Sequence, residues 1–255
     1  NIYDEGERAY NTTYKYHLAE FGFSDVWYKN LRFGLGLRFE YYKYKDFLFK
    51  KPELTGLDVE SEHFLSYFAQ VYYSTFDKGY FPSKGTEFKA AYSLYTDNMA
   101  QYNDHAPFSA LSGSWASVVP VTRRFSIIPS IYGRVLIGKD IAYPLQNAIG
   151  GEVYGLYIPQ QLPFAGVTNM ELMDNSIMIA SVKLRQRMGS IHYLTLTGNY
   201  GLTDSHFFEI LKGKQLFGIS AGYGMDSMFG PLEITFGYSN QTDKGSCYVN
   251  LGYYF

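Results

Sequence analysis

The pattern in this 255-residue chain that most resembles catalytic chemistry is GISAG, Gly218 to Gly222, which has the G-x-S-x-G spacing of a serine nucleophile elbow. That motif requires a strand, a sharp turn and a helix, so that the serine stands at the turn. Here every second residue from Phe217 to Tyr223 is apolar, which predicts a strand running straight through the motif. Ser220 is therefore interpreted as an ordinary strand serine, and we expect no catalytic residue within this chain.

Residues that bind metals or form disulfides do not form a recognisable site either. The five histidines have no zinc-type spacing; they are His17, His63, His105, His192 and His206. Cys247 is the single cysteine, so no disulfide can form within the chain. We expect no metal and no cofactor.

Composition indicates which class of fold must position the polar residues. The net charge is -2, which gives no basic excess for nucleic acid. The chain has 26 Tyr, 20 Phe and 25 Gly with a mean hydropathy of only -0.19. No apolar run approaches the ~18 residues of a spanning helix. Many aromatic rings in a chain that is not strongly apolar favour a transmembrane β-barrel, which has an apolar outside, a polar lumen and aromatic rims.

Strict alternation of apolar and polar residues recurs along the chain and assigns the two faces of the strands. The apolar set predicts that Leu35, Val182, Ile234 and Leu251 face lipid. The alternate positions predict that Arg38, Lys183, Thr235 and Asn250 face the lumen. Eleven strands are expected, at 10–21, 31–44, 63–75, 85–96, 108–119, 125–137, 176–188, 190–200, 215–226, 230–240 and 245–255.

The links between these strands alternate in length, as in outer-membrane barrels with short periplasmic turns and long outer loops. Short links are expected at 119–124, 188–190 and 226–231. Long links are expected at 45–61, 96–106, 138–175 and 201–214. Because bacterial single-chain barrels normally have an even number of strands, eleven predict a chain whose leading strands lie outside this sequence. The whole of 1–255 is expected to be one barrel domain.

The segment STFDKGYFPSKGTEF, Ser74 to Phe88, resembles a turn and strand of the outer-membrane assembly and translocation superfamily, the BamA/TamA-like or bacterial surface antigen family. The matching residues are Asp77, Phe81, Pro82 and Gly85. NAIGGEVYG, Asn147 to Gly155, resembles the start of the family's long sixth outer loop, with Gly150, Gly151 and Gly155 as its glycines. The resemblance runs from about Phe64 to the C-terminus. It implies the last two-thirds of a sixteen-stranded, all-β, antiparallel barrel with this loop folded into the lumen.

Two positions depart from the family pattern. The loop usually has an Arg before Gly155, where this chain has Tyr154, and the facing strand usually has an acid where this chain has Lys183. The familiar ion pair is therefore absent. We expect Glu152 to pair instead with Lys183 or Arg185 as the anchor of the loop. In the alternative, these bases line a hydrated lumen and Glu152 lies in solvent.

The terminal strand resembles the family's recognition signal for the barrel-assembly machinery, with Gly252, Tyr253 and Phe255 at its end. These rings are otherwise simple rim aromatics. The resemblance implies a location in the bacterial outer membrane, with lipid and lipopolysaccharide as neighbours, the assembly machinery as a partner during biogenesis, and a homodimer or membrane-complex partner as a further possibility.

Three function classes follow. The first is a translocation, display or anchoring barrel, whose segment YIPQQLPFAG, Tyr157 to Gly166, resembles the branch fused to a patatin-like phospholipase domain. Lipase activity would then belong to a domain outside this chain. The second class is an insertase or assembly factor. The third is a diffusion porin, which the loop of 138–175 argues against because it would fill the pore.

Overall fold

Eleven long strands form the wall of the molecule in a computed structural model that describes residues 2–4, 7–49, 62–98, 100–104, 106–153, 155, 158–228 and 230–252. The wall strands are β2 (Glu7–Tyr28), β3 (Leu31–Phe49), β4 (Glu62–Ser74), β5 (Gly85–Thr96), β6 (Phe108–Pro120), β7 (Phe125–Ile137), β11 (Ser176–Met188), β12 (His192–Asp204), β13 (Lys214–Ser227), β14 (Gly230–Ser239) and β15 (Lys244–Leu251). Within these residues no helix is long and apolar enough to cross a membrane.

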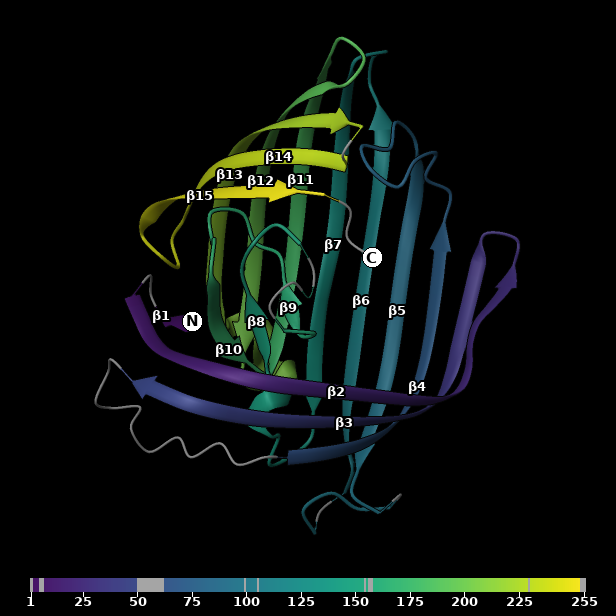
Figure 1. The fold of residues 1–255 in the computed structure, drawn as a ribbon, viewed down its shortest axis with the longest axis vertical. Helices are drawn as coiled ribbons and strands as arrows, with labels where there is room; N and C mark the ends of the chain where they lie inside the picture. Colours follow the sequence, from purple (N-terminus) through teal and green to yellow (C-terminus); the bar gives the residue numbers. More distant parts are fainter. Residues whose placement is uncertain are drawn as a thin grey trace.

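Each wall strand pairs antiparallel with its neighbour, and β7 pairs directly with β11 across the long loop between them. Figure 1 shows the resulting sheet curving around an interior that contains the loop strands. β15 forms one edge of the sheet in the described residues, and its only neighbour in the strand order is β14. The expected all-β antiparallel barrel architecture is confirmed.

The long link between β7 and β11 forms a small structure of its own on the concave side of the sheet (Figure 1). It contains the 3-10 helix η2 (Tyr143–Leu145) and the short strands β8 (Asn147–Ile149), β9 (Gln161–Leu162) and β10 (Met170–Asp174). β8 pairs with both β9 and β10, and β10 pairs in parallel with the short strand β1 (Ile2–Asp4). We call residues 138–175 the lumen loop.

Burial confirms the predicted faces of the strands. Leu35, Val182 and Leu251 are exposed on the outer face, with exposed fractions of 58%, 47% and 67%. Ile234 lies on the same face, since it is directly opposite the exposed Val249 of β15. On the inner face Asn250 is only 5% exposed. Apolar outer side chains and buried polar inner ones are the pattern expected of a barrel in lipid.

The predicted boundaries were least accurate at β2, which runs from residue 7 to 28 where 10–21 was expected. Irregular pairing with β3 between Asn11 and Thr13, and between Phe23 and Val26, interrupts the alternation on which the prediction depended. β12 begins at His192 instead of 190, because Gly189 is in a left-handed turn with φ 72°. The part of the link 45–61 beyond Phe49 lies outside the described residues.

Candidate functional site: the lumen and its loop

The Gly-Gly pair opens the ordered core of the lumen loop. Gly150 and Gly151 have φ values of 150° and 66°, which residues other than glycine rarely adopt. A Cβ on Gly150 would overlap the Asn169 carbonyl oxygen. The backbone N–H of Gly150 donates to the Leu162 carbonyl at 2.9 Å, and the N–H of Gly151 donates to the Val167 carbonyl at 2.7 Å. The pair therefore lets neighbouring segments of the loop cross at backbone distance.

Arg134 of β7 holds the beginning of the loop. Its guanidinium Nη1 donates to the Leu145 carbonyl at 2.7 Å and to Asn147 Oδ1 at 2.6 Å. Asn147 is fully buried, and its Nδ2 donates back to the Arg134 carbonyl at 3.0 Å and to the Asn175 carbonyl at 2.9 Å. The contact thus joins both ends of the loop to one wall strand through a charge-assisted hydrogen bond.

A second anchor lies deeper, at the buried carboxylate of Glu40 on β3. Three tyrosine hydroxyls donate to it: Tyr16 at 3.0 Å, Tyr42 at 3.2 Å and Tyr95 at 3.0 Å. Gln160 of the loop then donates from Nε2 to the Tyr42 hydroxyl at 2.8 Å. Glu40 is only 3% exposed, and a buried carboxylate needs such donors because desolvation is costly. We call these five residues the Glu40 cage.

Close backbone packing holds the loop against β13 and β14. Gly166 has φ 80°, and a Cβ there would overlap the backbone of Tyr238. Gly237 faces it, and a Cβ on Gly237 would lie 2.8 Å from the Gly166 Cα. Similarly, a Cβ on Gly218 would overlap the Ala165 carbonyl oxygen. Glycines on both sides therefore allow the loop and the wall to touch without intervening side chains.

An apolar core between the loop and the wall completes this contact. It consists of buried side chains from the loop and from the inner faces of β7, β11 and β13: Tyr132, Ile149, Leu162, Phe164, Val167, Ile177, Ile179 and Leu216. Tyr132 also donates its hydroxyl to the Pro163 carbonyl at 2.8 Å and accepts from Asn199 Nδ2 at 2.9 Å. Buried apolar surface of this kind stabilises the loop inside the barrel.

The expected ion pair of Glu152 is not formed in the described part of the chain. The carboxylate accepts a hydrogen bond from Thr235 Oγ1 at 3.3 Å, and no described Lys or Arg lies within ion-pair distance of it. Burial raises the pKa of Glu152 above its usual value, while the charge of Lys183 acts in the opposite direction. Gly155 has φ 64° and donates its N–H to the Gln161 carbonyl at 3.1 Å. Tyr154 lies outside the described residues.

Arg185, the other proposed partner of Glu152, contacts the motif turn between β4 and β5. Its Nη2 donates to the Pro82 carbonyl, and its guanidinium lies 5.7 Å from the centre of the Tyr193 ring. Phe81 stacks on the same ring, with centroids 4.3 Å apart and an interplanar angle of 9°. Two motifs that the sequence separates by about a hundred residues therefore meet in the lumen.

Asp77 shapes the motif turn itself. Its Oδ1 accepts hydrogen bonds from the backbone N–H of Ser83 at 2.7 Å and of Lys84 at 3.4 Å, and Oδ2 accepts from the Ser83 hydroxyl. Desolvation acts to raise the pKa of Asp77, but these hydrogen-bond donors lower it below its usual value. Gly85 has φ 111°, and a Cβ there would overlap the Thr75 carbonyl oxygen. The turn therefore requires an aspartate at position 77 and a glycine at position 85.

Two cavities separate the loop from the inner surface of the wall. The larger, of about 950 Å³, is lined by Arg38, Glu40, Lys89 and Arg134 among other residues. The smaller, of about 300 Å³, has Glu152, Lys183, Arg185 and Glu233 in its lining. Both cavities have ionisable side chains of both signs in their lining, so charged groups face the space that the loop leaves.

The remaining predicted residues lie on β13 and at the end of β15. Ser220 is 4% exposed in the middle of β13, on the inner face, so the interpretation of GISAG as strand is confirmed. Gly252 has φ 106° and donates its N–H to the Pro231 carbonyl at 3.0 Å, which ends the strand. Tyr253 and Phe255 lie outside the described residues, and their role as an assembly signal stays a prediction.

Sequence reasoning missed the Glu40 cage and Arg134. The inward position of Glu40 followed from the alternation in 31–41, but its tyrosine partners lie on β2, β3 and β5 and share no local motif. Arg134 lies on a strand that was predicted correctly, yet nothing in its neighbourhood marks it as a contact of the loop. Only the pairing of β7 with β11 places it there.

An antiparallel sheet with an apolar exterior, a polar interior and a loop bonded inside it defines an outer-membrane β-barrel with a filled lumen. The sequence profile of the OMP85 superfamily matches residues 4–255, so this chain belongs to that superfamily and is a bacterial outer-membrane protein. The resemblance of the sequence to this superfamily is thereby confirmed.

Among solved structures, the chain is similar to BamA from Haemophilus ducreyi lacking POTRA domains 1–3, with a TM-score of 0.61 and 11% sequence identity. The match covers 92% of this chain and 52% of that one, so the chain spans about half the length of its structural relative. No curated protein matches the sequence.

Proposed function

We propose that this barrel is the membrane-embedded part of a translocation, display or anchoring system, with a lumen closed at rest by the lumen loop. The observation that supports the proposal is the attachment of the loop to the wall on three sides. Arg134 holds it on β7, the Glu40 cage holds it through Gln160, and Gly237 packs against it on β14. A diffusion porin would need an open channel where these contacts lie.

Planar-bilayer recordings test this proposal. We expect the unmodified protein to give small or flickering currents, and deletion of 152–166 to give a large, steady pore, because that segment contributes β9 and the core residues Leu162 and Phe164. Phe208→Ala serves as the control, since this ring is 86% exposed in the 3-10 helix η3 (Phe207–Lys212) between β12 and β13 and lines neither cavity of the lumen. Large, steady currents from the unmodified protein would support the porin instead.

An insertase or assembly factor is the second candidate, and the edge strand β15 favours it. In the described residues β15 is the end strand of the sheet, and a sheet edge is where an incoming strand can add. Liposomes containing this protein would then accelerate membrane insertion of an unfolded test barrel compared with empty liposomes. Equal insertion rates in the two preparations would contradict this candidate.

We further propose that the anchored domain is patatin-like, which the segment 157–166 supports by resemblance. The coding sequence upstream of Asn1 distinguishes the candidates. A G-x-S-x-G on a strand-to-helix turn would support a lipase fusion, whereas repeated small α/β domains would favour the insertase. Lipopolysaccharide, the barrel-assembly machinery and a second copy of the chain stay proposed partners.

A further inference from the structure

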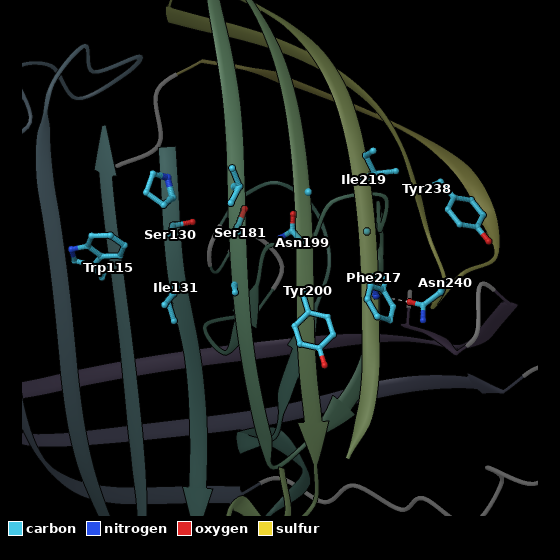
Figure 2. A pocket seen from close by; sticks show the side chains of 15 residues that line it. Trp115, Ser130, Ile131, Ser181, Asn199, Tyr200, Phe217, Ile219, Tyr238 and Asn240 are labelled. Carbon is cyan, nitrogen blue, oxygen red and sulfur yellow. Dashed lines mark hydrogen bonds between the residues drawn. The ribbon is translucent and has the colours of Figure 1, made fainter. Parts of the chain in front are cut away.

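A groove on the outer face of the barrel is formed by residues that the luminal function does not use. It crosses β6, β7 and β11–β14, has a volume of about 600 Å³, and is lined almost entirely by apolar surface. Figure 2 shows Trp115 on one side and the rings of Tyr200, Phe217 and Tyr238 on the other. This volume is in the range of about 300–1,000 Å³ that is usual for ligand pockets.

The floor of the groove consists of small residues at positions where a barrel normally presents large apolar side chains to lipid. Ala180 of β11 and Gly198 of β12 are both exposed on the outer face. In the sheet, Ala180 lies opposite Tyr200, and Gly198 lies opposite Val182 and Ile219. Larger neighbours therefore surround a diagonal pair of small residues.

Gly198 has no backbone reason to be glycine. A Cβ added to Gly198 would have no atom within 4 Å, and the φ of Gly198 lies outside the left-handed region. By contrast, Gly218 on the next strand must be glycine because the Ala165 carbonyl lies against it. Glycine within a strand is destabilising, since it loses more conformational entropy and packs no side chain. The missing side chain at Gly198 therefore leaves space outside the barrel and serves no internal contact.

The wall of the groove is packed on the side nearer the link between β12 and β13. The rings of Tyr200 and Phe217 lie across adjacent strands with centroids 5.1 Å apart. Beyond them, Asn240 fixes the beginning of β13 by accepting from the Phe217 N–H at 2.8 Å and donating to the Gln215 carbonyl at 3.1 Å. An occupant would thus lie in a formed site and would not have to order a loop.

We propose that this groove binds one acyl chain of a phospholipid as a retained lipid. The groove lies on the membrane-facing surface of an outer-membrane protein, so acyl chains are the apolar groups that reach it. Among the described residues that line it there is no Lys or Arg. A multiply phosphorylated lipid such as lipopolysaccharide would find no cation there, whereas a zwitterionic phospholipid needs none.

Fluorescence quenching tests the proposal on the detergent-solubilised full chain. The sequence has two tryptophans, Trp27 and Trp115, so Trp27→Phe leaves Trp115, in the groove, as the single tryptophan whose emission is followed. A phosphatidylcholine with brominated acyl chains is titrated at fixed detergent concentration. We expect quenching that saturates near one lipid per protein.

Two variants fill the groove, and one matched variant leaves it intact. Gly198→Phe and Ala180→Phe should each weaken the apparent affinity about tenfold or more, equivalent to about 1.4 kcal/mol. Ala69→Phe adds the same ring to the outer face of β4 and should leave the titration unchanged. Resistance to unfolding in SDS at room temperature verifies that each variant is folded, and Ala180→Phe provides a second reading if Gly198→Phe does not fold.

Three results would overturn the proposal. Quenching that rises in proportion to the lipid-to-detergent ratio without saturating would indicate simple partitioning. Equal quenching in the two filled variants and the parent would place the lipid elsewhere. Displacement of the brominated lipid by equimolar lipid A, but not by unbrominated phosphatidylcholine, would assign the groove to lipopolysaccharide.

Discussion

Gln160 and Tyr42 are 118 residues apart in the sequence, yet the amide Nε2 of Gln160 donates to the Tyr42 hydroxyl at 2.8 Å inside the barrel. Tyr42 in turn donates to the buried carboxylate of Glu40. One hydroxyl therefore links the lumen loop to the wall, and its removal would leave the Gln160 amide N–H without an acceptor and the Glu40 carboxylate without one of its donors.

We expect Tyr42→Phe to destabilise the protein by about 1–3 kcal/mol, because buried polar groups would lose their partner. Urea unfolding followed by tryptophan fluorescence measures the change, and planar-bilayer recordings should show more frequent opening. Tyr41→Phe is the control, since Tyr41 lies on the outer face of the same strand. Equal effects of the two substitutions would remove the Glu40 cage as an anchor.

Gly166→Ala should loosen the loop from β14. The new Cβ would overlap the Tyr238 backbone, and the left-handed conformation costs a residue with a side chain about 1–2 kcal/mol in addition. We expect a lower unfolding midpoint and larger currents than in the parent. Gly79→Ala, where a Cβ meets no atom within 4 Å, is the matched control. A normal closed lumen in Gly166→Ala would show that backbone packing on Gly237 is dispensable.

Ile234→Arg should destabilise the barrel by about 2–4 kcal/mol if this position is near the bilayer midplane, because the charge would enter lipid. Ser114 lines both cavities of the lumen, so Ser114→Arg places the same side chain on the inner face and should have a much smaller effect. Unfolding of both variants in lipid vesicles gives the comparison. A reversed order of stability would mean that the two faces were assigned wrongly.

Glu152 should make stability depend on pH. Its folded pKa is raised, so between the unfolded value of 4.5 and the folded value the folded state binds more protons than the unfolded state. Its contribution to the free energy of unfolding therefore falls as pH rises through this window and stays lower above it. Glu152→Gln should remove this fall and be more stable than the parent at pH 8. Parallel pH profiles for the parent and the variant would contradict the burial of this carboxyl.

The double variant Glu152→Gln with Lys183→Met tests whether the two charges interact. If the Lys183 charge favours the ionised carboxylate, the effects of the single substitutions at pH 8 should not add. The same cycle with Arg185→Met is expected to be additive, because Arg185 contacts the Pro82 carbonyl in the motif turn. Additive effects in both cycles would mean that neither base interacts with Glu152, and would leave Thr235 as the hydrogen-bond partner of its carboxylate.

The sequence by itself determined the wall of this protein. Period-two alternation places Leu35 and Val182 outside and Asn250 inside, because successive side chains of a strand point to opposite faces and lipid accepts only one of the two sets. Glycines at 85, 150 and 151 were singled out by their resemblance to family motifs, and each has a positive φ in the fold. Where bulges interrupt β2, the alternation and the prediction failed together.

Only the tertiary structure decided what fastens the loop. Glu152 had been expected to pair with Lys183 or Arg185, but in the fold its carboxylate meets Thr235 while Arg185 reaches the motif turn. Arg134 and Tyr42 became anchors through strand pairing and the path of the loop, which no local pattern encodes. A hydrogen bond depends on distances of about 3 Å between atoms, and the curvature of the whole sheet sets those distances.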